Sequence, residues 1–217
     1  MCGRFALKNP GQQLKQFYNT ANAVEYQARY NIAPSLPVIT IHGTPAGERL
    51  MELMRWGLVP SWSKDPAIGN KMINARAETV EEKPSYRTSF KRRRCIVPAS
   101  GFFEWHTKTR EPYYFSLGEA PLSMAGLWDK WASPDGSELL SCTIITTIAN
   151  KVLAPIHERM PVILDQDALE VWLGDTEDVP LLKSLLKPYD NDKLKAWAIS
   201  KLVNSPGNNI PEILEAV

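Results

Sequence analysis

The spacing of hydrophobic positions changes along the chain, from a helical repeat near the start to alternation in the middle. Leu14, Phe17 and Tyr18 recur at the interval of one helix face, so residues 12–20 are predicted to form a helix. Farther on, short alternating or β-branched segments stand between Pro, Gly, Asp and Ser residues, which is typical of strands and turns. The predicted strands cover residues 37–42, 50–58, 95–97, 102–106, 113–117, 122–128, 139–148 and 161–164.

Helical spacing returns near the end of the chain, where acidic residues stand at helix-start positions. Asp165 or Asp167 is predicted to cap a helix that ends at Gly174, because a carboxylate accepts hydrogen bonds from the first free N–H groups of a helix. Asp178 is predicted to cap a second, leucine-rich helix that stops at Pro188, since proline cannot continue a helix.

The order of these elements predicts the fold class. A final strand is predicted over residues 194–200, so strands fill the middle of the chain and helices lie near its ends, a grouping that favours an α+β fold. The chain has 217 residues, and no Gly/Ser tract, low-complexity stretch or internal repeat divides it. We therefore predict a single α+β domain over residues 1–217, with a curved, largely antiparallel, barrel-like sheet flanked by helices.

Composition and charge narrow the functional classes. Hydrophobic residues make up 44% of the chain, which is enough for a packed core and excludes wholesale disorder. The net charge of +1 gives no overall field that would draw the molecule onto nucleic acid or an anionic membrane, so any anion site must be local. No window approaches the ~18 apolar residues of a membrane helix, and the start has no basic region followed by an apolar one, so we expect a soluble protein that is not secreted.

The cysteines and glycines indicate whether the chain binds a metal or a cofactor. Cys2, Cys95 and Cys142 are odd in number and far apart in the sequence, which fits a reducing compartment better than a disulfide framework. Zinc held by these three cysteines and a histidine is an alternative, although no ligand pair has the spacing of a metal site. The sequence has no phosphate-binding glycine loop, so we expect neither a cofactor nor a metal.

Cys2 is the first candidate for chemistry. If Met1 is removed, the chain begins with an amine and a thiol on adjacent carbons, whose ordinary pKa values are roughly 7.7–8.0 and roughly 8.5. With an aldehyde, the amine forms a Schiff base and the thiol then closes a five-membered thiazolidine. The alternative is a cysteine that occurs by chance on a frayed terminus. Gly3 would allow close approach to a ligand, Phe5 would anchor the terminus, and Arg4 would hold a phosphate, lower the pKa of the amine or be a solvated charge.

Two further side chains could move protons. Glu104 lies in an apolar strand, so an inward-facing carboxyl would be desolvated and its pKa raised toward neutrality, as a general acid or base requires. Alternation alone favours a solvent-facing Glu104, because Phe103 and Trp105 share the opposite face of the strand. His157 stands in a proline-bracketed turn, where it could shuttle protons or make a structural hydrogen bond.

Other side chains suit contact with a nucleic acid. Asn74 offers a donor and an acceptor to a sugar hydroxyl or to the terminal amine, with an ordinary turn cap as the alternative. Arg76 could bind phosphate and Trp62 could stack on a base of a single strand, whereas burial in the core is the alternative for Trp62. The basic run over residues 91–94 is either a phosphate track or a charged flank that protects the next strand from aggregation.

Six motifs occur in one order along the chain, and together they closely resemble the SRAP family, named for SOS-response-associated peptidases. The motifs are Met1-Cys2-Gly3-Arg4-Phe5, Arg29-Tyr30-Asn31-Ile32-Ala33-Pro34, Arg55-Trp56-Gly57-Leu58-Val59-Pro60, Asn74-Ala75-Arg76-Ala77-Glu78-Thr79, Gly101-Phe102-Phe103-Glu104-Trp105 and Ile156-His157-Glu158-Arg159-Met160-Pro161. The resemblance spans essentially the whole chain. It implies an abasic-site sensor that binds single-stranded DNA and joins itself covalently to the ring-opened sugar aldehyde.

The resemblance also implies roles for individual residues. It makes Cys2 the nucleophile, exposed after Met1 is lost by self-processing. It makes Glu104 the catalytic glutamate, pointing into the site, and Asn74 the residue that positions the substrate or the terminal amine. His157 is expected to assist Schiff-base chemistry and its reversal. The positions expected along the DNA strand are Gly3, Arg4, Pro34, Trp62, Arg76 and Thr146, and the stretch over residues 63–73 is expected to be long and flexible.

Partners and place of action follow from the same resemblance. We expect single-stranded DNA with abasic sites as the partner, no membrane, a monomer, and a location with the nucleoid in a bacterial cytoplasm or in a eukaryotic nucleus; recruitment by a replication-fork partner is left open. Two alternatives remain. One is a cysteine peptidase that uses Cys2 with Glu104 and His157 on peptide bonds. The other is a non-covalent reader of single-stranded or modified DNA.

Overall fold

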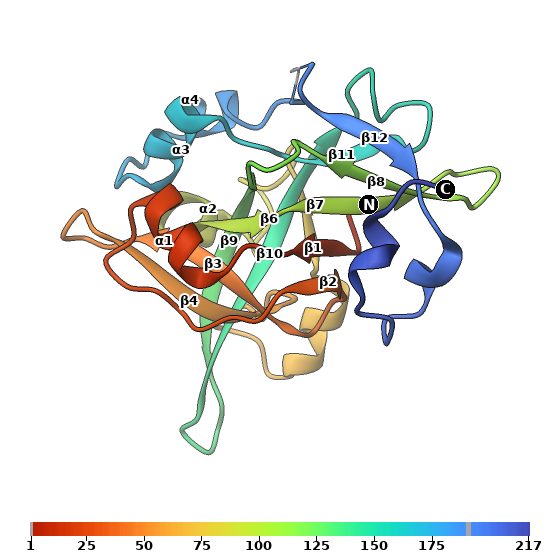
Figure 1. The fold of residues 1–217 in the computed structure, drawn as a ribbon. Helices are drawn as coiled ribbons and strands as arrows, with labels where there is room; N and C mark the ends of the chain where they lie inside the picture. Colours follow the sequence, from red (N-terminus) through yellow and green to blue (C-terminus); the bar gives the residue numbers. More distant parts are fainter. Residues whose placement is uncertain (1, 190–191) are drawn as a thin grey trace.

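A closed barrel of five strands forms the centre of the computed structural model, which describes residues 2–189 and 192–217. The strands follow one another around the barrel as β10, β4, β3, β6 and β9, and β9 pairs again with β10 (Figure 1). All neighbours are antiparallel except β10 and β4. The bounds are β3 Pro37–Gly43, β4 Arg49–Trp56, β6 Arg94–Ala99, β9 Leu122–Ala132 and β10 Glu138–Ile148.

Two short strands extend the barrel at the far end of β10. β5 (Asn74–Arg76) runs parallel to β10, and β11 (Arg159–Pro161) runs antiparallel to it. Their register sets Arg76 and Pro161 opposite the same residue, Thr146. The end of β5 and the start of β11 are therefore brought to the same end of β10.

A second, fully antiparallel sheet of five strands lies beside the barrel, in the order β12, β8, β7, β1, β2. Only Ser100 separates β6 of the barrel from β7 of this sheet, so the chain passes directly from one to the other. The bounds are β1 Phe5–Leu7, β2 Arg29–Ile32, β7 Gly101–Trp105, β8 Pro112–Ser116 and β12 Lys195–Ala198.

Short helices complete the fold. The α-helices are α1 Gly11–Tyr18, α2 Arg87–Arg92, α3 Gln166–Leu173 and α4 Val179–Ser184, and the 3-10 helices are η1 Pro66–Lys71, η2 Lys201–Asn204 and η3 Pro211–Leu214. Among the described residues, no helix is both long and apolar enough to cross a membrane. Helices at the ends of a strand-rich chain give the α+β class that the sequence predicts.

One apolar core joins the two sheets and fixes the start of the chain. Phe5 and Trp56 are fully buried, and their rings meet edge to face with centroids 5.1 Å apart. Phe5 belongs to the second sheet and Trp56 to the barrel, so this contact clamps β1 against β4. The anchoring role expected of Phe5 is confirmed, because burial of one large aromatic side chain contributes about 1.5–3 kcal/mol to stability.

Most predicted elements exist, and some of their ends differ. Asp165, rather than Asp167, caps α3, since its carboxylate accepts the N–H of Ala168 at 2.9 Å. Asp178 caps α4 as predicted, but the helix ends at Ser184 and does not continue to residue 188. After that point the N–H of Leu186 bonds to Lys183 O, a 3-10 turn that tightens and ends the helix.

Several expectations were wrong. The strands β1, β2 and β5 and the helix α2 were not predicted, and the strand expected over residues 161–164 begins earlier, as β11. The stretch expected to be flexible contains η1, which Asp65 caps by accepting the N–H of Ala67 at 2.8 Å. Gly57 and Gly69 let η1 approach the barrel, because a Cβ on Gly69 would lie 2.6 Å from Gly57 O.

Candidate active site

The nucleophile candidate lies where the two sheets meet. β1 pairs with β7 so that Phe5 is opposite Phe102, and the N–H of Phe103 donates to Arg4 O at 3.0 Å. Continuing this antiparallel register towards the chain start brings Glu104 level with Gly3. Cys2 is fully buried there, so the start of the chain is held by the sheet and is not frayed.

A carboxyl with a raised pKa is the second member of the site. Glu104 is 3% exposed, so the solvent-facing alternative is wrong. Burial, the largest effect on this carboxyl, raises the pKa of Glu104 to about 7. At neutral pH the group is therefore divided between its acidic and basic forms, which suits proton transfer in both directions.

The carboxylate of Glu104 also affects the pKa of the Cys2 thiol. Burial raises the pKa of the thiol well above its usual range, and the negative charge of Glu104 raises it further. The backbone N–H of Arg4 bonds to the sulfur and lowers the pKa in part. The thiol is thus protonated at neutral pH, and a nearby base is needed before the sulfur can act as a nucleophile.

Asn74 connects the barrel to the start of the chain. It is the first residue of β5, opposite Ile144 of β10. Its Nδ2 donates to Cys2 O at 2.9 Å, so a side chain of the barrel fixes the backbone of the nucleophile. Its Oδ1 is buried and has no hydrogen-bond partner among the described residues, which leaves an acceptor for a bound hydroxyl or amine.

His157 lies in the loop between β10 and β11. The N–H of Arg159 donates to His157 Nδ1 at 3.0 Å, so the proton of the neutral ring is on Nε2. Burial lowers the pKa of His157, which keeps the ring neutral at pH 7. The N–H of Thr107 donates to Ile156 O at 3.0 Å and ties this loop to the end of β7, the strand of Glu104.

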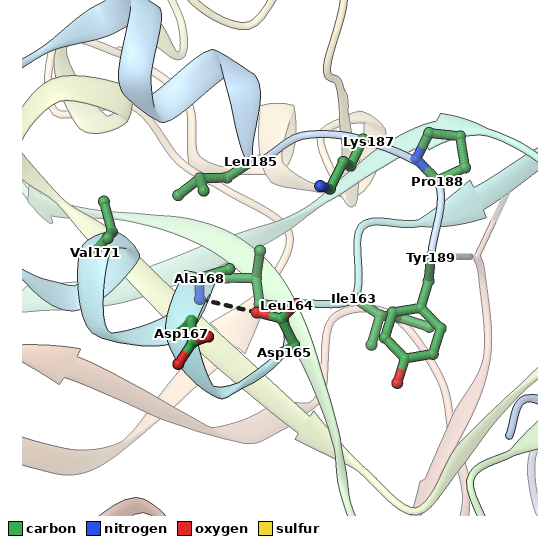
Figure 2. A pocket seen from close by; sticks show the side chains of 10 residues that line it. All are labelled: Ile163, Leu164, Asp165, Asp167, Ala168, Val171, Leu185, Lys187, Pro188 and Tyr189. Carbon is green, nitrogen blue, oxygen red and sulfur yellow. Dashed lines mark hydrogen bonds between the residues drawn. The ribbon is translucent and has the colours of Figure 1, made fainter. Parts of the chain in front are cut away.

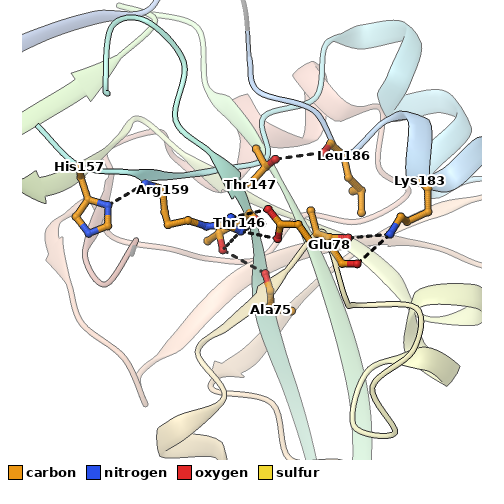
Figure 3. Close-up of polar contacts among 9 residues, drawn as sticks. Ala75, Glu78, Thr146, Thr147, His157, Arg159, Lys183 and Leu186 are labelled. Atoms are coloured by element: carbon orange, nitrogen blue, oxygen red, sulfur yellow. Dashed lines mark hydrogen bonds and ion pairs between the residues drawn. The ribbon is translucent and has the colours of Figure 1, made fainter. Parts of the chain in front are cut away.

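A polar cluster that the sequence did not indicate supports His157 (Figure 3). Arg159 forms a two-pronged ion pair with Glu78, with Nη1–Oε1 at 2.5 Å and Nη2–Oε2 at 3.0 Å. Arg159 Nη2 also donates to Thr146 O at 2.7 Å. Lys183 of α4 donates to Glu78 O, so the cluster joins α4, the end of β10 and the start of β11. Glu78 and Arg159 stand within the motifs, which is the one signal that could have found them.

The residues expected along the DNA differ in exposure. Trp62 is 60% exposed, so burial in the core is wrong for it, and Arg76 is also exposed. Gly3, Arg4 and Pro34 are half-buried. Thr146 is fully buried, and its hydroxyl donates to Ala75 O at 3.3 Å. A DNA strand could therefore reach Trp62 and Arg76 without a rearrangement of the protein.

The basic run at residues 91–94 is largely occupied within the protein. Arg94 is 6% exposed and donates to the carbonyls of Phe90, Lys91, Trp172 and Gly174. Arg92 pairs with Glu177 and Arg93 with Asp129. These contacts bind α2 and β6 to α3, the segment that follows it and β9, so most of the run holds elements together.

One cavity lies away from these residues. It measures about 610 Å³ and lies between α3 and the segment after α4 (Figure 2). Its lining combines apolar side chains such as Leu164, Val171 and Leu185 with Asp165, Asp167 and Lys187. Over residues 2–189 and 192–217, no group of three or more His, Cys, Asp or Glu side chains is placed to hold a metal ion.

Comparisons with known proteins agree on one family. The family model described as SOS response associated peptidase (SRAP) matches residues 1–206. The chain is 46% identical over 224 residues to the abasic site processing protein YoqW of Bacillus subtilis, with 100% of both chains covered. It is 36% identical over 226 residues to the abasic site processing protein HMCES of Xenopus tropicalis, covering 89% of this chain and 67% of that protein.

The fold is shared with solved structures. A crystal structure of a protein from Bacteroides thetaiotaomicron superposes with a TM-score of 0.90 at 30% sequence identity, and 100% of both chains is covered. A protein from Bordetella bronchiseptica superposes with a TM-score of 0.79 at 26% identity, covering 92% of this chain.

Proposed function

Because the chain belongs to the SOS response associated peptidase family, we propose that it processes abasic sites in single-stranded DNA by joining Cys2 covalently to the ring-opened sugar aldehyde. The observation that carries the proposal is the placement of Cys2, whose thiol is buried against Glu104 and whose carbonyl is held by Asn74. The similar proteins named abasic site processing proteins support the choice of substrate. Met1, which must be removed first, lies outside the described residues.

The first step forms an imine. The free amine of Cys2 attacks the aldehyde carbon, and a carbinolamine results. Its hydroxyl leaves as water after it takes a proton from a general acid, and a carbon–nitrogen double bond forms. Glu104, whose pKa burial raises to about 7, can supply such a proton near neutral pH.

The second step closes the ring and uses Glu104 in the opposite sense. Having given up its proton, the carboxylate accepts the proton of the Cys2 thiol, whose raised pKa makes such a base necessary. The sulfur adds to the carbon of the protonated imine and a carbon–sulfur bond forms. The electron pair of the double bond returns to the nitrogen, which keeps the proton that it already has. The product is a thiazolidine, and the balance of both steps is the loss of one water molecule.

Capture by the thiol decides the fate of the DNA. An imine at an abasic sugar promotes β-elimination, which breaks the strand. Addition of sulfur removes the imine and so prevents that elimination. Ring closure is favoured because the thiol and the imine nitrogen stand on adjacent carbons of Cys2, so the step is intramolecular, and such proximity is worth several orders of magnitude in rate.

The remaining residues of the site would hold the substrate. His157, neutral with its proton on Nε2, would exchange protons with the sugar oxygen and assist reversal of the adduct. Exposed Arg76 would bind a phosphate, and Trp62 would stack on a base. The half-buried residues Gly3, Arg4 and Pro34 complete the proposed contacts with the strand, whereas the fully buried Thr146 would need a rearrangement to touch it.

The test combines denaturing gel mobility with intact mass. Protein is incubated with single-stranded DNA that carries one abasic site, with the wild type and Cys2→Ala in parallel. We expect the wild type to form a band whose mass equals protein without Met1 plus DNA minus one water. Cys2→Ala should form no stable band, yet cyanoborohydride should trap its imine, because the amine is still present.

Other outcomes favour the other functions. If the wild type lacks Met1 and forms no adduct, the covalent proposal is wrong. Equal, purely non-covalent binding of abasic and intact strands would then favour a DNA reader. Repeated cleavage of an added peptide would favour a peptidase, since a cross-linker stops after one adduct per chain, and removal of Met1 alone requires no external substrate.

A further inference from the structure

A recess opens beside Trp62, in the chain segment that leads to Asn74. We call this recess, whose lining side chains lie between residues 62 and 71, the η1 pocket; its volume of about 580 Å³ is in the range of sites that bind small molecules. The exposed Trp62 and the half-buried Ile68 give it apolar walls. Lys64 and Lys71 add two exposed, positively charged side chains. A flat apolar group and an anion therefore fit the same recess.

The charge of the η1 pocket is positive overall. Its one carboxylate among the described residues, that of Asp65, accepts the N–H of Ala67 at 2.8 Å and so caps η1. Two lysines stand against it, so the recess attracts an anion, although the whole chain has a net charge of only +1. A nucleotide joins an anion to a flat ring, because its base stacks on an aromatic side chain and its phosphate binds a lysine ammonium. The lining therefore matches one nucleotide of a single strand.

Hydrogen bonds from the barrel hold the η1 pocket in shape. Trp131 of β9 donates from Nε1 to Ser63 O at 2.7 Å, which fixes the chain directly after Trp62. Arg55 of β4 donates from Nη2 to Asn70 Oδ1 at 2.7 Å, which fixes η1. The two walls are therefore in place without a ligand, so binding does not require this segment to be ordered first.

The η1 pocket lies on one side of Asn74, and Arg76 lies on the other. Strand β5 and the residue before it bond to β10, so the chain is extended there, with Asn74 between Arg76 and the end of η1. Lys71 is the last residue of η1, and three residues of chain reach at most about 11 Å, so its backbone is within that distance of Asn74. A strand that places its abasic sugar at Asn74 and a phosphate at Arg76 therefore brings the nucleotide on its other side to the pocket.

We infer that the η1 pocket binds the nucleotide next to the abasic sugar, on the side away from Arg76. The base of this nucleotide lies against Trp62 and Ile68. Lys64 and Lys71 bind its phosphates. The inference rests on the proposed function and adds to it a subsite that recognises an intact nucleotide. Lys64, Ile68 and Lys71 lie outside the six motifs, so the resemblance assigns them no role.

The experiment measures affinity for DNA that cannot react. Fluorescence anisotropy follows binding of the full chain to a single-stranded oligonucleotide that carries a tetrahydrofuran, which has no aldehyde, in place of the abasic sugar. In two further oligonucleotides, a second tetrahydrofuran removes the base on one side or on the other. The wild type is compared with Trp62→Ala and Lys71→Gln, and with Lys195→Gln on the edge strand β12 as the control.

We expect removal of the base on one side to weaken binding by the wild type about tenfold, the effect of one base that stacks on an aromatic side chain. Trp62→Ala should bind DNA with and without that base equally well, within about twofold, because the stacking surface is gone. Lys71→Gln should keep the response to the base and make the slope of log K against log salt less steep by about 0.7, since one phosphate contact is lost. Lys195→Gln should match the wild type in both readouts.

Lys71→Arg separates loss of charge from damage to η1, because it keeps the cation and should have the wild-type salt slope. The inference is overturned if neither flanking base affects binding by the wild type, or if Trp62→Ala still responds to the same base. It is also overturned if Lys71→Gln keeps the wild-type salt slope. Cross-linking of an ordinary abasic oligonucleotide is measured beside these variants. Its absence in the wild type would refute the proposed function, whereas the responses to base and salt still decide what the η1 pocket binds.

Discussion

The carboxyl of Glu104 occupies a place that favours chemistry at the expense of stability. It is buried beside the thiol of Cys2, and its pKa is raised to about 7 from an ordinary value of 4.5. A carboxylate in such surroundings is poorly solvated, so removing its charge should have opposite effects on cross-linking and on folding.

Glu104→Gln keeps the size of the side chain and removes its ability to exchange a proton. We expect the single-turnover cross-linking rate at pH 7 to fall by about 10²–10⁴-fold, the usual contribution of general acid–base catalysis. The dissociation constant for DNA should change by less than about threefold. Glu119→Gln, at an exposed carboxylate, serves as the control. A Glu104→Gln rate within threefold of the wild type would remove Glu104 from the proton transfers.

The same substitution should stabilise the protein at neutral pH. The folded chain holds the Glu104 proton more tightly than the unfolded chain between pH 4.5 and about 7. Stability of the wild type therefore falls as the pH rises through this range, and the full cost of about 3 kcal/mol applies above it. Urea unfolding of the wild type and Glu104→Gln from pH 5 to 8 should diverge accordingly. A difference that does not change from pH 5 to 8 would mean that the folded and unfolded chains hold the Glu104 proton equally, so that the pKa of Glu104 is not raised by folding.

The resemblance to the family predicted the inward-facing Glu104, and the burial of this side chain confirms it, whereas alternation along the strand did not predict it. Alternation favoured the wrong face for Glu104, because both faces of β7 are buried: Phe102, on the face of Glu104, packs in the main core, and Phe103 packs in a second apolar cluster. Asn31 was not singled out although it lies in one of the six motifs, because a single asparagine in a short strand has no periodic pattern. Its side chain donates to three carbonyls more than 170 residues later in the sequence.

The approach of η1 to the barrel depends on a glycine that tolerates no side chain. Gly57 has a φ of +133°, and a Cβ on Gly69 would lie 2.6 Å from Gly57 O, which cannot move freely. Gly69→Ala should lower the free energy of unfolding by about 1–3 kcal/mol, as overpacking does. Gly207→Ala, where the nearest atom is 3.8 Å away, should change it by less than about 0.5 kcal/mol in the same chemical unfolding assay. Equal changes in the free energy of unfolding for Gly69→Ala and Gly207→Ala would mean that η1 moves to accommodate the added methyl group without a loss of stability.

The junction of α2 and β6 depends on a buried cation. Arg94 donates to four carbonyls, whereas Arg92 forms an exposed ion pair with Glu177. Lysine keeps the charge but lacks the planar fork, so Arg94→Lys should lower the free energy of unfolding by about 2–4 kcal/mol. Arg92→Lys should cost less than about 1 kcal/mol. Thermal or urea unfolding of the two variants measures both losses in the free energy of unfolding. Two small and similar losses would mean that Arg94 acts only as a surface charge and has no structural role.

Elements with a clear period were predictable and short ones were not. The strands of the barrel alternate or are β-branched over five or more residues, and α3 has an aspartate cap and a terminal glycine. β1, β2 and β5 have only three or four residues each. They are strands because neighbouring strands supply their hydrogen bonds, which a local pattern does not contain. α4 ended early for a similar reason, since Thr147 of β10 donates to the carbonyl of Leu186.

With a net charge of +1, the molecule as a whole has little attraction for DNA, so binding should depend on a few local contacts. Each phosphate contact on a single strand contributes about −0.7 to the slope of log K against log salt. Arg76→Gln should therefore make the slope measured by fluorescence anisotropy less steep by about 0.7, whereas Lys195→Gln, on the edge strand β12, should leave it unchanged. Covalent capture makes weak binding sufficient, because each adduct persists after the salt-sensitive encounter. Raising the salt should slow the initial rate at low DNA concentration and leave the final yield of adduct unchanged; a yield that falls with salt would mean that the adduct reverses on the time scale of the encounter.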